Sequence, residues 1–120
     1  MTRYETTGER PTDYSKWHRS LPDYCKAQDV DWVEYRIKED IPMPVAVVET
    51  GRWSRSKFKG SQIVLSRHIA EKLDVPSYFV EYAIDENNYE NNVFKVKNLN
   101  NDNGFRIMSN KEYSKFIMKM

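Results

Sequence analysis

The feature that most constrains the fold is the apolar run at residues 45–48 (VAVV), which ends in the carboxylate Glu49. A short β-branched run of this kind is typical of a strand buried on both faces. The segment 61–73 follows, and apolar side chains at i, i+4 and i+8 predict that it forms an amphipathic helix with a buried face made of Leu65, Ile69 and Leu73. Residues 78–84 (YFVEYAI) predict another strand. A strand, a helix and a strand in this order favour a parallel crossover.

The segments on either side of this unit predict further strands. Residues 30–37 alternate between apolar and polar side chains and, after a polar turn at 38–40, are expected to form a hairpin with residues 44–49. Within that hairpin, Glu34 is expected to form a cross-strand salt bridge. Residues 93–96 alternate in the same way and predict an edge strand around Phe94.

Helices are predicted at both ends of the domain. Asp13 or Ser15 can cap a short helix, on which we interpret Trp17 as a core anchor. At the other end, a short extended segment at 105–108 is followed by Ser109 and Glu112, whose spacing is that of a capping box. The sequence therefore predicts an α/β (α+β) fold, a small mixed sheet flanked by helices, in one domain over residues 14–120. Residues 1–13 are polar and are expected to form a flexible arm.

Composition excludes several classes of protein. Nineteen Lys and Arg residues against 18 Asp and Glu leave a net charge of +1, so binding through bulk charge is not expected. A single cysteine, Cys25, closes no internal disulfide and excludes cysteine-based zinc or iron–sulfur sites. The longest apolar run is far shorter than the roughly 20 residues that span a bilayer. We expect a cytoplasmic protein without a membrane segment.

Three polar residues stand at the ends of the predicted elements. Asp31 opens the strand at 30–37, Glu49 ends the neighbouring strand, and Gln62 opens the following helix. Paired strands lie about 4.8 Å apart, so an Asp and a Glu on neighbouring strands can share one cation. Mg²⁺ (or Mn²⁺) prefers oxygen ligands and retains several waters. The alternative is structural: Asp31 satisfied by turn amides, and Gln62 an ordinary residue of a first helical turn.

The order of these elements, a helix, a strand with Asp, a strand ending in Glu, a helix and a strand, resembles the PD-(D/E)xK nuclease superfamily, in particular its small members from phages, archaeal viruses and prokaryotes. The stretches that carry this resemblance are residues 14–19 (YSKWHR), 29–36 (DVDWVEYR), 45–50 (VAVVET), 61–62 (SQ) and 76–80 (PSYFV). The resemblance implies a restriction-endonuclease-like core and metal-dependent hydrolysis of phosphodiester bonds, in DNA rather than RNA. It implies that Asp31 and Glu49 are the metal ligands and that Gln62 lies near the site. If the protein is of phage or viral origin, the host cytoplasm is its expected location.

One position departs from the family pattern. The family places a lysine two residues after the second acidic residue, and here that residue is Gly51. Losing one such donor costs on the order of 10²–10³ in rate, by analogy with oxyanion-hole deletions. Lys57 or Lys59, or Arg52, can replace it from the loop that follows. Otherwise the domain is a catalytically inactive module that binds nucleic acid or a host protein.

A basic loop spans residues 51–60. Its cations alternate with the rings of Trp53 and Phe58; they are Arg52, Arg55, Lys57 and Lys59. Cations and stacking rings together suit a phosphate backbone and unpaired bases. Lys16 and Arg19 are expected to extend the same surface, although a solvated surface turn is the simpler interpretation of the loop. A homodimer is a further expectation, with the predicted edge strand near Phe94 as its surface.

Overall fold

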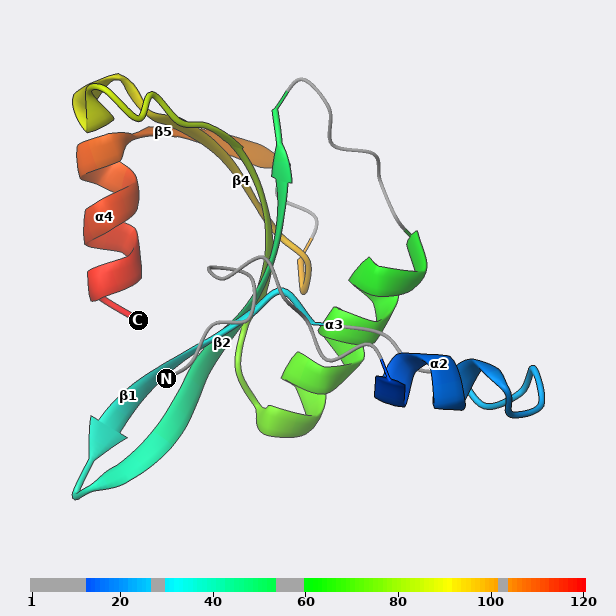
Figure 1. Ribbon diagram of the computed structural model, residues 1–120. Helices are drawn as coiled ribbons and strands as arrows, with labels where there is room; N and C mark the ends of the chain where they lie inside the picture. The colour runs from blue at the N-terminus through cyan, green and yellow to red at the C-terminus, as the bar shows by residue number, and fades with distance from the viewer. Residues whose placement is uncertain (1–12, 27–29, 54–59, 102–103) are drawn as a thin grey trace.

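The computed structural model describes residues 13–26, 30–53, 60–101 and 104–120, and Figure 1 shows how they are arranged. Five strands form one mixed sheet in the order β1-β2-β3-β4-β5, with helices on both of its faces. The predicted α/β (α+β) class, a small mixed sheet flanked by helices, is confirmed. The arm expected at residues 1–13 lies outside the described residues except for Asp13.

The hairpin predicted before the crossover is present. β1 (Trp32–Lys38) pairs antiparallel with β2 (Ile41–Arg52), and the two-residue turn between them holds Glu39 and Asp40 at φ values of 51° and 64°. Two successive positive φ values are the geometry of the hairpin turns that match the twist of the strands. Between Glu34 and Tyr35 the register shifts, which is a β-bulge.

The parallel crossover is also confirmed. β2 leads through α3 (Gly60–Leu73) to β3 (Ser77–Ala83), which pairs parallel with β2. β2 is longer than the predicted strand at 44–49, because Gly51 and Arg52 pair with β3 instead of belonging to the following loop. The pairing with a strand distant in sequence, which no local pattern encodes, adds these residues to the sheet.

The buried face of α3 differs from the predicted one. The side chains that α3 buries are Ile63, Ser66 and Ala70, whereas Leu65 and Leu73 are exposed. The helix is thus rotated by about one residue, or roughly 100°, from the face predicted by its leucines. The small side chains of Ser66 and Ala70 allow the helix to pack closely on the sheet, so packing overrides the apolar periodicity.

The second half of the chain closes the other face of the sheet. β4 (Val93–Asn98) and β5 (Phe105–Ser109) follow a 3₁₀ turn, η1 (Tyr89–Asn91), and lead into α4 (Asn110–Met118). The predicted capping box is confirmed, because Ser109 Oγ accepts from the Glu112 N–H and the Glu112 carboxylate accepts from the Ser109 N–H. α3 and α4 lie on opposite sides of the sheet (Figure 1).

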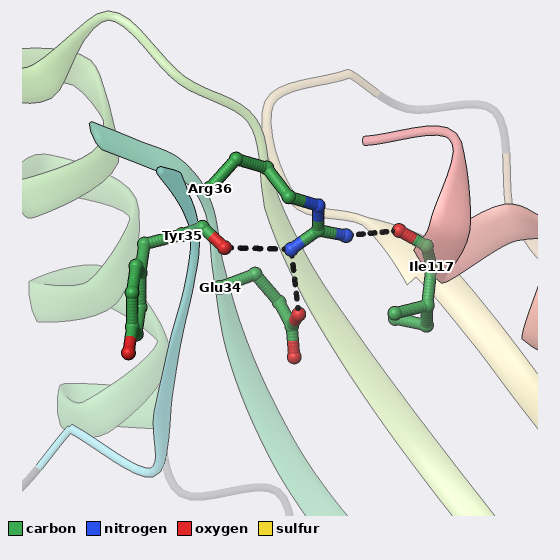
Figure 2. Close-up of polar contacts among 4 residues, drawn as sticks. All are labelled: Glu34, Tyr35, Arg36 and Ile117. Atoms are coloured by element: carbon green, nitrogen blue, oxygen red, sulfur yellow. Dashed lines mark hydrogen bonds and ion pairs between the residues drawn. The ribbon is translucent and has the colours of Figure 1, made fainter. Parts of the chain in front are cut away.

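The main hydrophobic core lies between the sheet and α4. Its buried members come from four strands and are Ala46, Val48, Val80, Phe94, Val96 and Met108. From α4, Tyr113 stacks on Phe94 with ring centroids 4.1 Å apart, and Phe116 meets Tyr78 edge-on at 5.0 Å. The end of α4 is fixed to the hairpin as well, since Arg36 Nη2 donates to the Ile117 carbonyl (Figure 2).

Three expectations about single residues are wrong. Phe94 is not on an edge strand: β4 lies between β3 and β5, and Phe94 is only 8% exposed. Trp17 is not a core anchor, because α2 (Asp13–Arg19) leaves it 55% exposed with its ring against Tyr14. Glu34 pairs with Arg36 on its own strand, at 3.4 Å, instead of across strands.

None of the described helices has the length and apolar character that a membrane-spanning segment requires.

Candidate functional site

The hairpin register brings Asp31 and Glu49 together. Trp32 pairs with Val48 and Val33 with Val47, so the residue before β1, Asp31, stands opposite Glu49. The Asp31 side chain and backbone N–H both lie close enough to the Glu49 carboxyl group to act on its pKa, which the side chain raises and the N–H lowers. The two acidic residues that the sequence analysis selected therefore meet at one place, from neighbouring strands as expected.

Glu49 is the buried member of this pair, at 4% exposed. Ser66 Oγ, on the face of α3 that packs against β2, donates a short hydrogen bond to Glu49 Oε1. Burial, and to a lesser degree the nearby Asp31 carboxylate, raise the pKa of Glu49 from 4.5 to about 7. Near neutral pH this carboxyl group is therefore poised between holding a proton and carrying a charge.

Asp31 is the exposed member, and the start of β1 and the end of β2 hold it in place. Its Oδ2 accepts from the Thr50 N–H at 2.9 Å and lies 3.4 Å from Thr50 Oγ1. Thr50 Oγ1 in turn accepts from Trp32 Nε1 at 3.3 Å. The structural interpretation of Asp31, a carboxylate satisfied by backbone amides, is thus met at Oδ2 by an amide of the neighbouring strand.

Gln62 lies on α3, the helix that also carries Ser66, the hydrogen-bond donor to Glu49. It is half-buried and stands one turn before Ser66, so both project from one face of α3, the face that packs on β2. Among the described residues, no group of three or more His, Cys, Asp or Glu side chains is placed to hold a metal ion. Two carboxylates are nevertheless a sufficient protein contribution for Mg²⁺, which is usually held by one or two of them together with substrate phosphates and water.

The predicted cations are only partly described. Arg52 ends β2 and is exposed, and Trp53 follows it at 37% exposed. Arg55, Lys57 and Lys59 lie outside the described residues. Lys16 and Arg19 project from α2, which makes no extensive contact with another described helix or strand.

Sequence analysis missed a cation on the Glu49 face of the sheet. Gly51 pairs with Glu81, and Glu81 pairs with Lys95 on β4. Lys95 Nζ lies 3.7 Å from the Glu81 carboxylate and 4.1 Å from the centre of the Phe105 ring. The ammonium group of Lys95 thus lies on β4, next to Glu81 of β3, which in turn is the partner of Gly51 on β2. The alternation of apolar and polar residues in β4 predicts that Lys95 and Lys97 share one face of the strand. Only the order of the strands shows that this face continues the one that carries Glu49.

An open cavity lies on the face of the sheet opposite to Glu49, and Thr50, the hydrogen-bond partner of Asp31, forms part of its wall. Its volume is about 1050 Å³, and it is bounded by Thr50 and Arg52 at the end of β2 and by Asp85, Glu86 and Asn87 after β3. Its aromatic lining consists of Trp32, Trp53, Tyr82, Phe94 and Tyr113. The hydrogen bonds from Trp32 to Thr50 and from Thr50 to Asp31 connect the cavity wall directly to the candidate site.

No family model, curated protein or solved structure matches this chain.

Proposed function

We propose that this protein is a metal-dependent nuclease-like domain that hydrolyses phosphodiester bonds in DNA, with Mg²⁺ or Mn²⁺ held by Asp31 and Glu49. The observation that carries the proposal is the meeting of these two carboxyl groups at the end of a buried strand, close enough for Asp31 to raise the pKa of Glu49. Two carboxylates this close repel each other unless a proton or a cation lies between them. A divalent cation between the two carboxylates would remove this repulsion.

Each acidic residue is held in place by a different hydrogen-bond donor. Ser66 orients Glu49 from α3, and the Thr50 N–H orients Asp31 from β2. With both carboxylates fixed by their own partners, little side-chain entropy is lost when they bind an ion. When bound, the metal would supply charge neutralisation at the scissile phosphate and activation of a water.

The surroundings of the pair suit a nucleic-acid strand with unpaired bases. The aromatic cavity offers Trp32 and Trp53 as stacking surfaces, and exposed Arg52 stands at the same rim for the phosphate backbone. On the Glu49 face, Lys95 is a candidate to compensate for the lysine that is missing at position 51. We therefore favour a substrate that is single-stranded or locally unpaired.

The test is a cleavage assay on plasmid and on single-stranded DNA with Mg²⁺ or Mn²⁺. Wild-type protein should cut, whereas Asp31→Asn and Glu49→Gln should not. Glu71→Gln is the control, since this exposed carboxylate lies on α3 and pairs only with Arg67 among the described residues. Equal activity in all four proteins would identify a contaminant and reject the proposal.

A matched pair of lysines tests the role of Lys95. Lys95 and Lys97 lie on the same face of β4, and both lie over the Phe105 ring, but only Lys95 is ion-paired with the residue opposite Gly51. If Lys95 acts in the reaction, Lys95→Met should lower the cleavage rate by on the order of 10²-fold and Lys97→Met by much less. Equal effects would assign both lysines to general DNA binding.

The second candidate function is DNA binding without cleavage, and Gly51 is the observation that favours it. In that case the wild type should bind DNA in the presence of a chelator, with an affinity that falls steeply with salt. Gly51→Lys should then create activity where the wild type has none. DNA affinity that is absent under all salt conditions would reject both functions.

A further inference from the structure

Among the described residues, no strand pairs with the outer edge of β1, and the side chains along one face of β1 are apolar. β1 is the terminal strand of the sheet, and β2 is the only described strand that pairs with it. Val33, Tyr35 and Ile37 alternate along one face of β1 and are 46%, 56% and 61% exposed. An edge strand of this length with apolar side chains is a template for pairing with another strand, which monomeric proteins usually protect.

We propose that two copies of the chain associate through this edge, with their β1 strands antiparallel about a two-fold axis at Tyr35. In this register Glu34 of one copy stands opposite Arg36 of the other, and the symmetry produces this pairing twice. Val33 likewise faces Ile37 of the second copy. The two sheets then continue into one another across the axis.

The charges of β1 select this register over its neighbours. Residues keep to their own face of the sheet, so the register can slip only in steps of two. A slip in one direction centres the two-fold axis on Glu34, so that the Glu34 carboxylates of the two copies face each other. A slip in the other direction centres the axis on Arg36, so that the two Arg36 side chains face each other. The register about Tyr35 is the only one of the three that avoids a like-charge pair on the axis.

The other edge of the sheet lacks this complementarity. β5 carries one charged residue, Arg106, so no antiparallel register of β5 with itself forms an opposite-charge pair. The tip of the β1–β2 hairpin also extends beyond both α3 and α4 (Figure 1). A second copy is therefore a better occupant of β1 than of β5.

The paired side chains are already held in position. Arg36 Nη1 lies 3.4 Å from Glu34 Oε1 and donates at 2.8 Å to the Tyr35 carbonyl, and its Nη2 reaches Ile117 (Figure 2). Pro44, which pairs with Tyr35 in the hairpin, has no N–H to donate to that carbonyl. Since the guanidinium group is already fixed within one chain, little entropy is lost when a second carboxylate approaches it.

Charge exchange tests the register. In sedimentation equilibrium the wild type should reach twice the single-chain mass of 14.3 kDa as its concentration rises. Glu34→Arg and Arg36→Glu should each weaken dimerisation about 30-fold, because both symmetric pairs become repulsive at roughly 1 kcal/mol each. The double variant carrying both changes should recover most of the affinity. A wild type that remains a single chain, or a double variant as weak as the single ones, would overturn the proposal.

A cross-link provides the second measurement, should the charge variants fold poorly. In a Cys25→Ser background, Tyr35→Cys places one thiol from each copy on the axis, where a mild oxidant should link them rapidly. Ile107→Cys, on the exposed face of β5, is the matched control. Linking no faster at position 35 than at position 107 would contradict the proposed axis. DNA cleavage does not enter either measurement, so the failure of this proposal and that of the nuclease proposal are distinguishable.

Discussion

Replacing Glu49 with glutamine should stabilise the metal-free protein at pH 8 and remove a specific part of its pH dependence. The folded protein holds the pKa of Glu49 at about 7, against an ordinary value of 4.5, chiefly because the carboxyl group is buried. Between these two values the folded state binds a proton that the unfolded state has lost. The free energy of unfolding therefore falls as pH rises through this window.

The size of the effect follows from the difference between the two pKa values. Each pKa unit corresponds to 1.36 kcal/mol, so the wild type should lose up to about 3 kcal/mol between pH 4.5 and pH 7 through Glu49. Below pH 4.5 this contribution to stability is fully present, and above pH 7 it is lost. A neutral amide does not titrate, and its oxygen can still accept from Ser66.

The assay is urea unfolding in the presence of a chelator at several pH values from 4 to 8, followed by tryptophan fluorescence. The informative quantity is the difference in unfolding free energy between Glu49→Gln and wild type, because every group other than Glu49 is present in both proteins. Glu71→Gln, at an exposed carboxylate of α3, is the matched control variant. Asp31→Asn should retain part of the effect, since desolvation outranks the Asp31 charge as a cause. Parallel pH profiles for wild type and Glu49→Gln would refute the reasoning.

Three further predictions concern the contacts around the site and the hairpin. Ser66→Ala should lower the free energy of unfolding by about 1–3 kcal/mol, measured by urea denaturation, because the fully buried hydroxyl is a hydrogen-bond donor to Glu49; an unchanged midpoint would contradict this contact. Arg36→Ala should increase hydrogen exchange at the end of α4 without affecting exchange in α3, because Arg36 binds the Ile117 carbonyl; equal changes in both helices would indicate general destabilisation. Asp40→Gly should increase the free energy of unfolding by about 0.5–1 kcal/mol and so raise the melting temperature, because glycine adopts the φ of 64° found at Asp40 without steric cost. A lower melting temperature would show that the aspartate makes a stabilising contact.

Much of the fold was predictable because its signals are local. The alternation along β1, the apolar run of β2 and the capping box at Ser109 each depend on residues only a few positions apart. The same is true of the crossover, since a strand, a helix and a strand with short connections leave few other arrangements. Asp31 and Glu49 could be selected for this reason: each stands at the end of a recognisable strand, and a hairpin makes those strands neighbours.

The rest was decided by packing between segments distant in the sequence. The rotation of α3, which places Ser66 over Glu49, depends on how closely a helix can approach the sheet and not on where its leucines fall. The position of Lys95, two strands from Gly51 and in register with it, depends on the order of the strands, as does the burial of Phe94 within the sheet. The sequence alone determined the elements and the two acidic residues, because hydrophobic periodicity and capping act over a few residues. Only the tertiary structure decided the partners of those acidic residues and the free edges of the sheet, because these depend on register and on which face each helix covers.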